Sequence, residues 1–125
     1  MRKEKTIRDR QLVELGRRTD CRRYEAIIDK YLADSYAQRT VARVSELAQL
    51  LDSARPYLSR IIPQLFGESL RAILRRKQIE EAKRLLTVTA LGLDEIAAAS
   101  AFGHRSTLFR VFRRLVGVTP GQYRK

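Results

Sequence analysis

Residues 101–120 read AFGHRSTLFRVFRRLVGVTP and combine two kinds of residue at helical spacing. The apolar side chains recur as they do on a helix face that packs against a core, at Phe102, Leu108, Val111, Phe112 and Leu115. Polar and basic side chains fill the positions between and after them, at His104, Arg105, Ser106, Thr107, Arg110, Arg113 and Arg114. Such a helix would turn its arginines toward a negatively charged surface.

The chain as a whole shares this basic bias. Its 125 residues include 26 Lys and Arg against 14 Asp and Glu, a formal net charge of +12. This charge implies a polyanionic partner, nucleic acid first and an acidic membrane surface second. No run of about 18 apolar residues could span a bilayer, and the first twenty residues lack the apolar stretch of a secretory signal. The single cysteine fits a reducing compartment, so we expect a cytoplasmic, nucleoid-associated protein.

Helix-period stripes follow one another along the chain, and no segment has the alternation of a β-strand. They predict helices over about 20–36, 44–51, 58–66, 69–86, 93–101 and 104–116, and a short turn near 120–123. A break is expected at Asp52 and Ser53, and Gly67 and Gly117 can end the third and sixth helices. The segment Thr6–Leu15 fits either a short helix or a solvated arm.

An internal repeat organises these helices. The two copies are residues 44–67, VSELAQLLDSARPYLSRIIPQLFG, and residues 93–117, LDEIAAASAFGHRSTLFRVFRRLVG. Both contain, in the same order, an apolar–Ala pair, a turn, a polar-rich start, an apolar stripe with one arginine and a terminal glycine. Leu58 matches Leu108, and Arg60 matches Arg110. Each copy has the pattern of a helix-turn-helix, whose second helix enters the major groove of DNA with its N-terminal turns toward the base edges.

We therefore predict an all-α fold of about seven helices, with two helix-turn-helix subdomains joined by a long linker helix. The expected divisions are an arm over 1–21, a first subdomain over 22–68, the linker over 69–88 and a second subdomain over 89–125. About 18 linker residues at about 1.5 Å each span roughly 27 Å. With part of each subdomain's width added, this approaches the roughly 34 Å between successive major grooves on one face of B-DNA.

The C-terminal segment IAAASAFGHRSTLFRVFRRLVGVTPGQYRK, residues 96–125, resembles the signature of AraC/XylS-type bacterial transcription regulators. That signature is I-A-x-x-x-G-F-x-x-x-S-x-F-x-R-x-F-K-x-x-x-G-x-T-P-x-x-Y-R. The matching positions are Ile96, Ala97, Phe102, Ser106, Arg110, Phe112, Gly117, Thr119, Pro120, Tyr123 and Arg124. YLSRIIPQLFG and RKQIEEAKRLL are similar to the family's first recognition helix and linker helix, so the resemblance covers residues 22–125.

The chain departs from the family pattern at four positions. Ala101 replaces a glycine in the second turn, at a site that favours no side chain. In the first copy, Ile62 and Pro63 replace a phenylalanine and a basic residue, and Pro63 should kink the helix near its end. Ala54 falls where the family has a capping serine, although Ser53 could cap the helix one residue early.

The resemblance also implies which residues contact DNA bases. In the second copy these are Arg105, Ser106, Thr107 and Arg110, and in the first they are Pro56, Ser59 and Arg60, with Arg55 close by. The residue types suit this role, because arginine can bond two acceptors of guanine and a threonine methyl can contact the thymine methyl. The alternative for Arg60 and Arg110 is a solvated helix face, and Ser106 could instead be a structural hydrogen-bonding group.

A further set of side chains could bind DNA phosphates, namely Arg71, Arg75, Arg76, Lys77, His104, Arg113 and Arg114. For the arginines and the lysine of this set, the alternative is a solvated, charged helix face. For His104 the alternative is plain exposure to solvent. We expect no cofactor and no metal, because the chain has one histidine and one cysteine.

These observations favour a sequence-specific DNA-binding transcription regulator. The resemblance implies that a stand-alone member binds an asymmetric site of double-stranded DNA as a monomer and recruits RNA polymerase as an activator. Two alternatives stay open: a basic module that binds DNA without sequence preference or binds a protein, and the DNA-binding fragment of a longer effector-responsive regulator. An enzyme is not expected, since there is no phosphate-binding glycine loop and no Ser/His/Asp or Cys/His arrangement.

Overall fold

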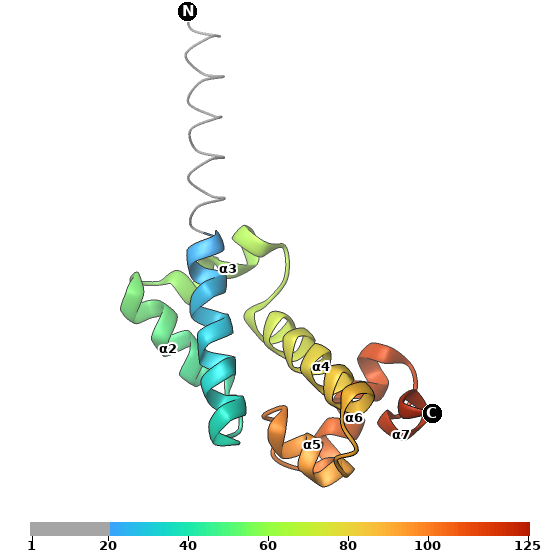
Figure 1. The fold of residues 1–125 in the computed structure, drawn as a ribbon. Helices are drawn as coiled ribbons and strands as arrows, with labels where there is room; N and C mark the ends of the chain where they lie inside the picture. The colour runs from blue at the N-terminus through green and yellow to red at the C-terminus, as the bar shows by residue number, and fades with distance from the viewer. Residues whose placement is uncertain (1–20) are drawn as a thin grey trace, which may run out of the picture.

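The structure, a computed structural model, describes residues 21–125 and shows helices joined by short turns, with no strand in this range. A first helix covers residues 21–38. It is followed by α2 (Val44–Ala54), α3 (Leu58–Phe66), α4 (Leu70–Val88), α5 (Leu93–Ala99), α6 (Arg105–Val116) and α7 (Pro120–Arg124). The predicted all-α fold, with two helix-turn-helix pairs joined by a long helix, is confirmed (Figure 1). The predicted arm and its candidate helix over Thr6–Leu15 lie outside the described residues.

Two core clusters of buried side chains hold these helices together. The first joins the 21–38 helix, α2, α3 and the start of α4, through Tyr24, Ile28, Leu32, Ala42, Leu47, Leu51, Leu58, Ile62, Leu70, Ile73, Leu74 and also Ala101. The second joins the rest of α4 to α5 and α6, through Ile79, Ala82, Leu85, Leu86, Ile96, Ala97, Phe102, Leu108, Val111 and Phe112. The linker helix α4 therefore contributes to both cores, and Figure 1 shows it running between the two groups of helices.

The start of α3 differs from the sequence prediction. The break predicted at Asp52 and Ser53 is wrong, because α2 continues to Ala54 and the Ser53 hydroxyl donates to the Gln49 carbonyl within that helix at 2.8 Å. Ser53 therefore does not cap α3. The cap comes from Asp52, whose carboxylate accepts from the backbone N–H of Ser59 at 2.8 Å and from its hydroxyl at 2.9 Å. A carboxylate at a helix N-terminus satisfies a free N–H and interacts favourably with the helix dipole.

Pro63 lies inside α3 but does not end it. The helix continues to Phe66 and stops at Gly67, whose φ of 74° lies in the left-handed region and whose N–H donates to the Pro63 carbonyl at 2.9 Å. The neighbouring Ile62 is fully buried in the first core cluster.

Ala101 occupies a strained turn between α5 and α6. Its φ is 64°, a left-handed conformation that costs an L-residue with a side chain about 1–2 kcal/mol, so the poor fit predicted for alanine is confirmed. This turn also ends α5 at Ala99, two residues before the predicted bound. The Ala101 carbonyl accepts from the backbone N–H of Ala42 and from the Gln78 side-chain amide, each at 3.0 Å. The strained turn is thereby bonded both to the segment before α2 and to the linker helix.

Candidate nucleic-acid interface

The second recognition helix, α6, presents the expected two faces. Leu108, Val111 and Phe112 are buried, as the apolar stripe predicts. The residues assigned to base contacts lie within its first two turns, and Arg105, Ser106 and Arg110 are exposed while Thr107 is partly buried. The structure therefore brings these four side chains together at the N-terminal half of one helix, which is the part that a helix-turn-helix presents to DNA.

Arg105 is the member of this group with a carboxylate partner. Its Nε lies 3.2 Å from Oδ1 of Asp94, in the first turn of α5, and both side chains are largely exposed. An exposed pair of this kind contributes about 0–1 kcal/mol. Arg105 can therefore exchange Asp94 for a base or a phosphate at small cost.

The first copy departs from the expected geometry. Arg55 and Pro56 do not lie on the recognition helix but in the turn before it, since α3 begins only at Leu58. Arg55 is extended, with φ −152° and ψ 122°, as the residue before a proline prefers. Tyr57 then takes φ 63° and leads into α3. Of the residues that the resemblance assigns to base contact in this copy, Pro56 and the nearby Arg55 therefore precede the helix, whereas Ser59 and Arg60 lie in its first turn.

The other members of the first copy are placed by specific contacts. Both polar groups of Ser59 are bonded to Asp52, as described above. The Arg60 guanidinium is exposed and lies 5.2 Å from the centroid of the Tyr57 ring, in cation–π range. Arg55 donates from Nη1 to the Tyr24 hydroxyl at 3.1 Å, which ties the turn to the 21–38 helix.

Tyr57 is a surface residue that the sequence reasoning missed. Its side chain is 67% exposed at the entrance to α3, unusual for a large aromatic residue. In the alignment of the two copies, Tyr57 falls opposite Thr107, which the family resemblance assigns to base contact. The repeat itself was thus the signal that could have identified it.

Five of the predicted phosphate contacts, four on the linker helix α4 and one near the end of α6, divide into two groups. Arg76 forms an ion pair with Glu68, and Lys77 lies 2.9 Å from both Glu25 and Asp29 of the 21–38 helix. Burial lowers the pKa of Lys77, but the two carboxylates outweigh it and raise the pKa overall. The Lys77 side chain is only 17% exposed, which favours a structural role for it over the predicted phosphate contact, and Arg76 donates two hydrogen bonds to Glu68.

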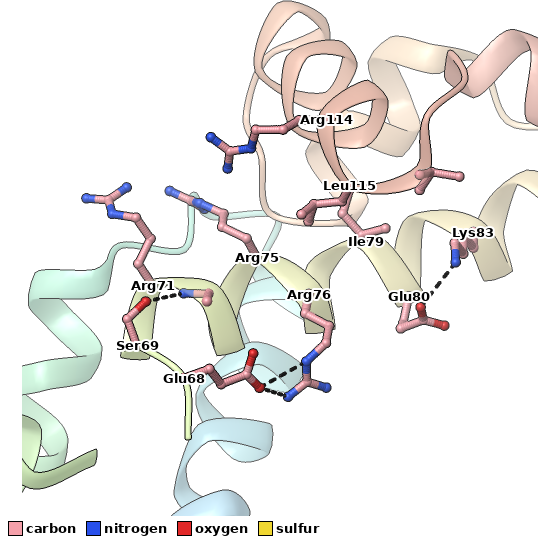
Figure 2. A pocket seen from close by; sticks show the side chains of 12 residues that line it. Glu68, Ser69, Arg71, Arg75, Arg76, Ile79, Glu80, Lys83, Arg114 and Leu115 are labelled. Carbon is pink, nitrogen blue, oxygen red and sulfur yellow. Dashed lines mark hydrogen bonds and ion pairs between the residues drawn. The ribbon is translucent and has the colours of Figure 1, made fainter. Parts of the chain in front are cut away.

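Arg71, Arg75 and Arg114 form the second group and line a pocket between α4 and the end of α6. The pocket has a volume of about 360 Å³, and Figure 2 shows the three arginines extending toward the same side of it. Burial, followed by the positive charges of Arg71, Arg110 and Arg114, lowers the pKa of Arg75. The remaining phosphate candidates, His104 and Arg113, are exposed at the start and in the last turn of α6.

Within residues 21–125, the structure brings together no group of three or more His, Cys, Asp or Glu side chains able to hold a metal ion. In this range, no helix is long and apolar enough to cross a membrane.

Comparison with known proteins identifies the same fold and motif. The model of a helix-turn-helix domain family matches residues 47–125. The chain is 36% identical over 83 residues, 66% of its length, to the HTH-type transcriptional regulator Rv1931c of Mycobacterium tuberculosis. It is 30% identical over 115 residues, 90% of its length, to the transcriptional activator NphR of a Rhodococcus species. The chain spans about a third, 32%, of the length of each of these relatives.

A solved structure agrees with these relatives. The DNA-binding domain of AdpA, a global transcriptional factor crystallised with a target DNA, superposes with a TM-score of 0.65 at 25% identity. The match covers 81% of this chain and 88% of that domain. With the family model extending over more than half of the chain, these findings show that the chain belongs to the AraC/XylS-type family of helix-turn-helix transcription regulators.

Proposed function

We propose that this protein is a sequence-specific transcription regulator that binds one asymmetric site of double-stranded DNA, with α3 and α6 in successive major grooves. The observation that carries the proposal is the repeated arginine. Arg60 and Arg110 are exposed at matching positions of two helix-turn-helix units that share the linker helix α4. One chain with two recognition helices can occupy two grooves without a second copy, so the protein binds as a monomer.

The roles of individual residues follow from their chemistry. Arg105, Ser106, Thr107 and Arg110 contact bases from α6, with the arginines suited to guanine. Arg60 contacts a base from α3, and Arg55, Pro56 and Ser59 line the entrance to the same groove. Arg71, Arg75, His104, Arg113 and Arg114 contact phosphates, and the protein's positive charge contributes affinity that does not depend on sequence.

The division into an arm (1–21), two subdomains (22–68 and 89–125) and a linker (69–88) remains part of this proposal. The proposal also includes that the protein activates transcription at the nucleoid by recruiting RNA polymerase, and that it catalyses no reaction. Support for activation comes from the name of the relative NphR, a transcriptional activator, and applies to this chain only by similarity.

Competition binding tests sequence specificity directly. Genome-wide mapping of the protein on DNA first supplies a cognate site. Labelled cognate DNA is then competed with unlabelled cognate or random duplex at a fixed salt concentration. The proposal expects a preference of about a thousandfold or more for the cognate site. Equal competition by random DNA would instead identify a basic module that binds DNA without sequence preference.

A reporter assay tests the sign of regulation. The mapped promoter is placed upstream of a reporter gene, and the protein is supplied from an inducible plasmid. Activation requires reporter output to rise with the protein and to stay flat with the Arg110→Ala variant. A fall in output on induction would make the protein a repressor.

A further inference from the structure

We infer that Arg71, Arg75 and Arg114 form a single site for one phosphate of the DNA backbone, with Gln78 as the residue that positions Arg75. This inference deepens the proposed function and rests on it, because it joins three separate candidate contacts into one site beside α6. It also adds a buried residue that touches no DNA.

The charge balance of the pocket is the first argument. Its lining includes five basic side chains and two carboxylates, those of Glu68 and Glu80. Both carboxylates already have partners, since Glu68 pairs with Arg76 and Glu80 with Lys83 (Figure 2). Across residues 21–125, the structure records no carboxylate paired with the three remaining cations, Arg71, Arg75 and Arg114. The pocket therefore has an uncompensated positive charge on one side.

The second argument is that Arg75 is held in place before any ligand arrives. Gln78 is fully buried, with 0% of its surface exposed, and its Oε1 accepts from Arg75 Nη1 at 2.7 Å. The Gln78 amide nitrogen donates to the carbonyls of Ser100 at 3.1 Å and Ala101 at 3.0 Å. A flipped amide would turn its oxygen toward these two carbonyls and its N–H groups toward the Arg75 guanidinium, so the oxygen must face Arg75. The remaining N–H groups of this guanidinium are thus directed by a fixed partner.

The third argument is the crowding of like charges around Arg75. Burial lowers the pKa of Arg75 most, and the positive charges of Arg71, Arg110 and Arg114 lower it further by disfavouring its protonated form. An anion placed among them relieves this repulsion and gains charge-assisted hydrogen bonds. Arg110 belongs to the base-contacting edge of α6, so the anion at this place is a phosphate that flanks the groove entered by α6.

Salt dependence of DNA binding distinguishes one shared phosphate from three separate ones. For duplex DNA, the slope of log K against log salt concentration changes by about 0.9 for each phosphate neutralised. The variants are Arg71→Gln, Arg75→Gln and Arg114→Gln, alone and together. Arg76→Gln is the matched control, because Arg76 lines the same pocket on the same helix but is paired with Glu68. Circular dichroism confirms that each variant is folded.

A shared site predicts that each single variant weakens binding about tenfold and that the triple variant lowers the slope by only about 0.9 in total. A fall of about 2.7, in three equal steps, would show three separate phosphates and overturn the inference. A triple variant no weaker than Arg76→Gln would overturn it too. These measurements use random duplex DNA, so they report on the phosphate site even if the wild-type protein shows no preference for its cognate site.

A double-mutant cycle tests the positioning role of Gln78. Gln78→Met removes the acceptor for Arg75 and keeps a side chain of similar length. It should weaken DNA binding about threefold to tenfold in the wild-type background and have no effect in the Arg75→Gln background. A role confined to stability would give the same loss of affinity in both backgrounds, which would refute the assignment.

Discussion

The substitution Gln78→Met should destabilise the fold, because it removes buried hydrogen bonds between α4 and the turn that joins α5 to α6. The Gln78 amide donates to the carbonyls of Ser100 and Ala101, and the Ala101 carbonyl also accepts from the N–H of Ala42, a member of the first core cluster. One buried side chain on α4 thus connects the turn of the second helix-turn-helix to the N-terminal half of the fold. Methionine fills a similar volume but cannot donate.

The magnitude follows from the partners that methionine leaves behind. The Ala101 carbonyl keeps its bond from Ala42, and Arg75 is partly exposed and can bond water instead. The Ser100 carbonyl loses its amide donor at a position that is fully buried. An unsatisfied buried acceptor costs about 1–3 kcal/mol, so we expect a loss of about 2 kcal/mol in the free energy of unfolding. For a chain of this size, that corresponds to a fall of about 8 °C in Tm.

Urea denaturation followed by far-ultraviolet circular dichroism measures this loss. The matched control is Gln49→Met, the same exchange at an exposed position of α2, which should stay within about 0.5 kcal/mol of the wild type. The m-value should be unchanged, so that the difference in midpoint reports stability alone. A free energy of unfolding for Gln78→Met within about 0.5 kcal/mol of the wild type would show that the Gln78 hydrogen bonds do not stabilise the fold, and would refute the reasoning.

Three further predictions concern the recognition helices α3 and α6 and the second core cluster. Arg110→Ala should cost about 1–3 kcal/mol on cognate DNA and less on random DNA, whereas Arg113→Ala should weaken both equally; equal losses for Arg110→Ala in competition binding would make it a phosphate contact. Asp52→Ala should lower the stability of the fold by about 1–2 kcal/mol in thermal melts, because α3 loses its cap, and an unchanged Tm would contradict that role. Ile96→Asp should abolish the second core cluster and reduce helicity in circular dichroism, since the side chain is fully buried; a variant with native helicity would refute the core assignment.

The helices could be predicted from the sequence because their bounds depend on local signals. The apolar stripe and Gly117 predict a helix over about 104–116, and α6 covers Arg105–Val116. The long helix predicted over about 69–86 corresponds to α4, which covers Leu70–Val88, and the Ser69 hydroxyl caps it by accepting from the N–H of Ala72 at 3.1 Å. In both cases the residues that determine the bound lie within one or two turns of it.

The features that were missed depend on contacts between distant segments. Gln78 looks like one more polar residue on a charged helix, and its burial follows only from the turn at Ser100 and Ala101, more than twenty residues away. The role of Asp52 as a cap depends on how α2 and α3 meet, and serine at position 53 offered a plausible local alternative. Local pattern identified the helices, but not the polar contacts that hold one helix against another.

The two recognition helices, α3 and α6, differ in the electrostatics of their N-termini. In α3, the backbone N–H of Ser59 donates to the Asp52 carboxylate. A DNA phosphate approaching this end would therefore meet a negative charge. In α6, the N-cap is His104, whose side chain makes no capping bond, and Arg105 follows it. The second reader thus keeps the helix N-terminus available to phosphate, while the first offers the exposed Tyr57 and Arg60. If both bind DNA, the α6 half-site should supply most of the salt-dependent affinity, and the difference between the readers fixes the orientation of the protein on an asymmetric site.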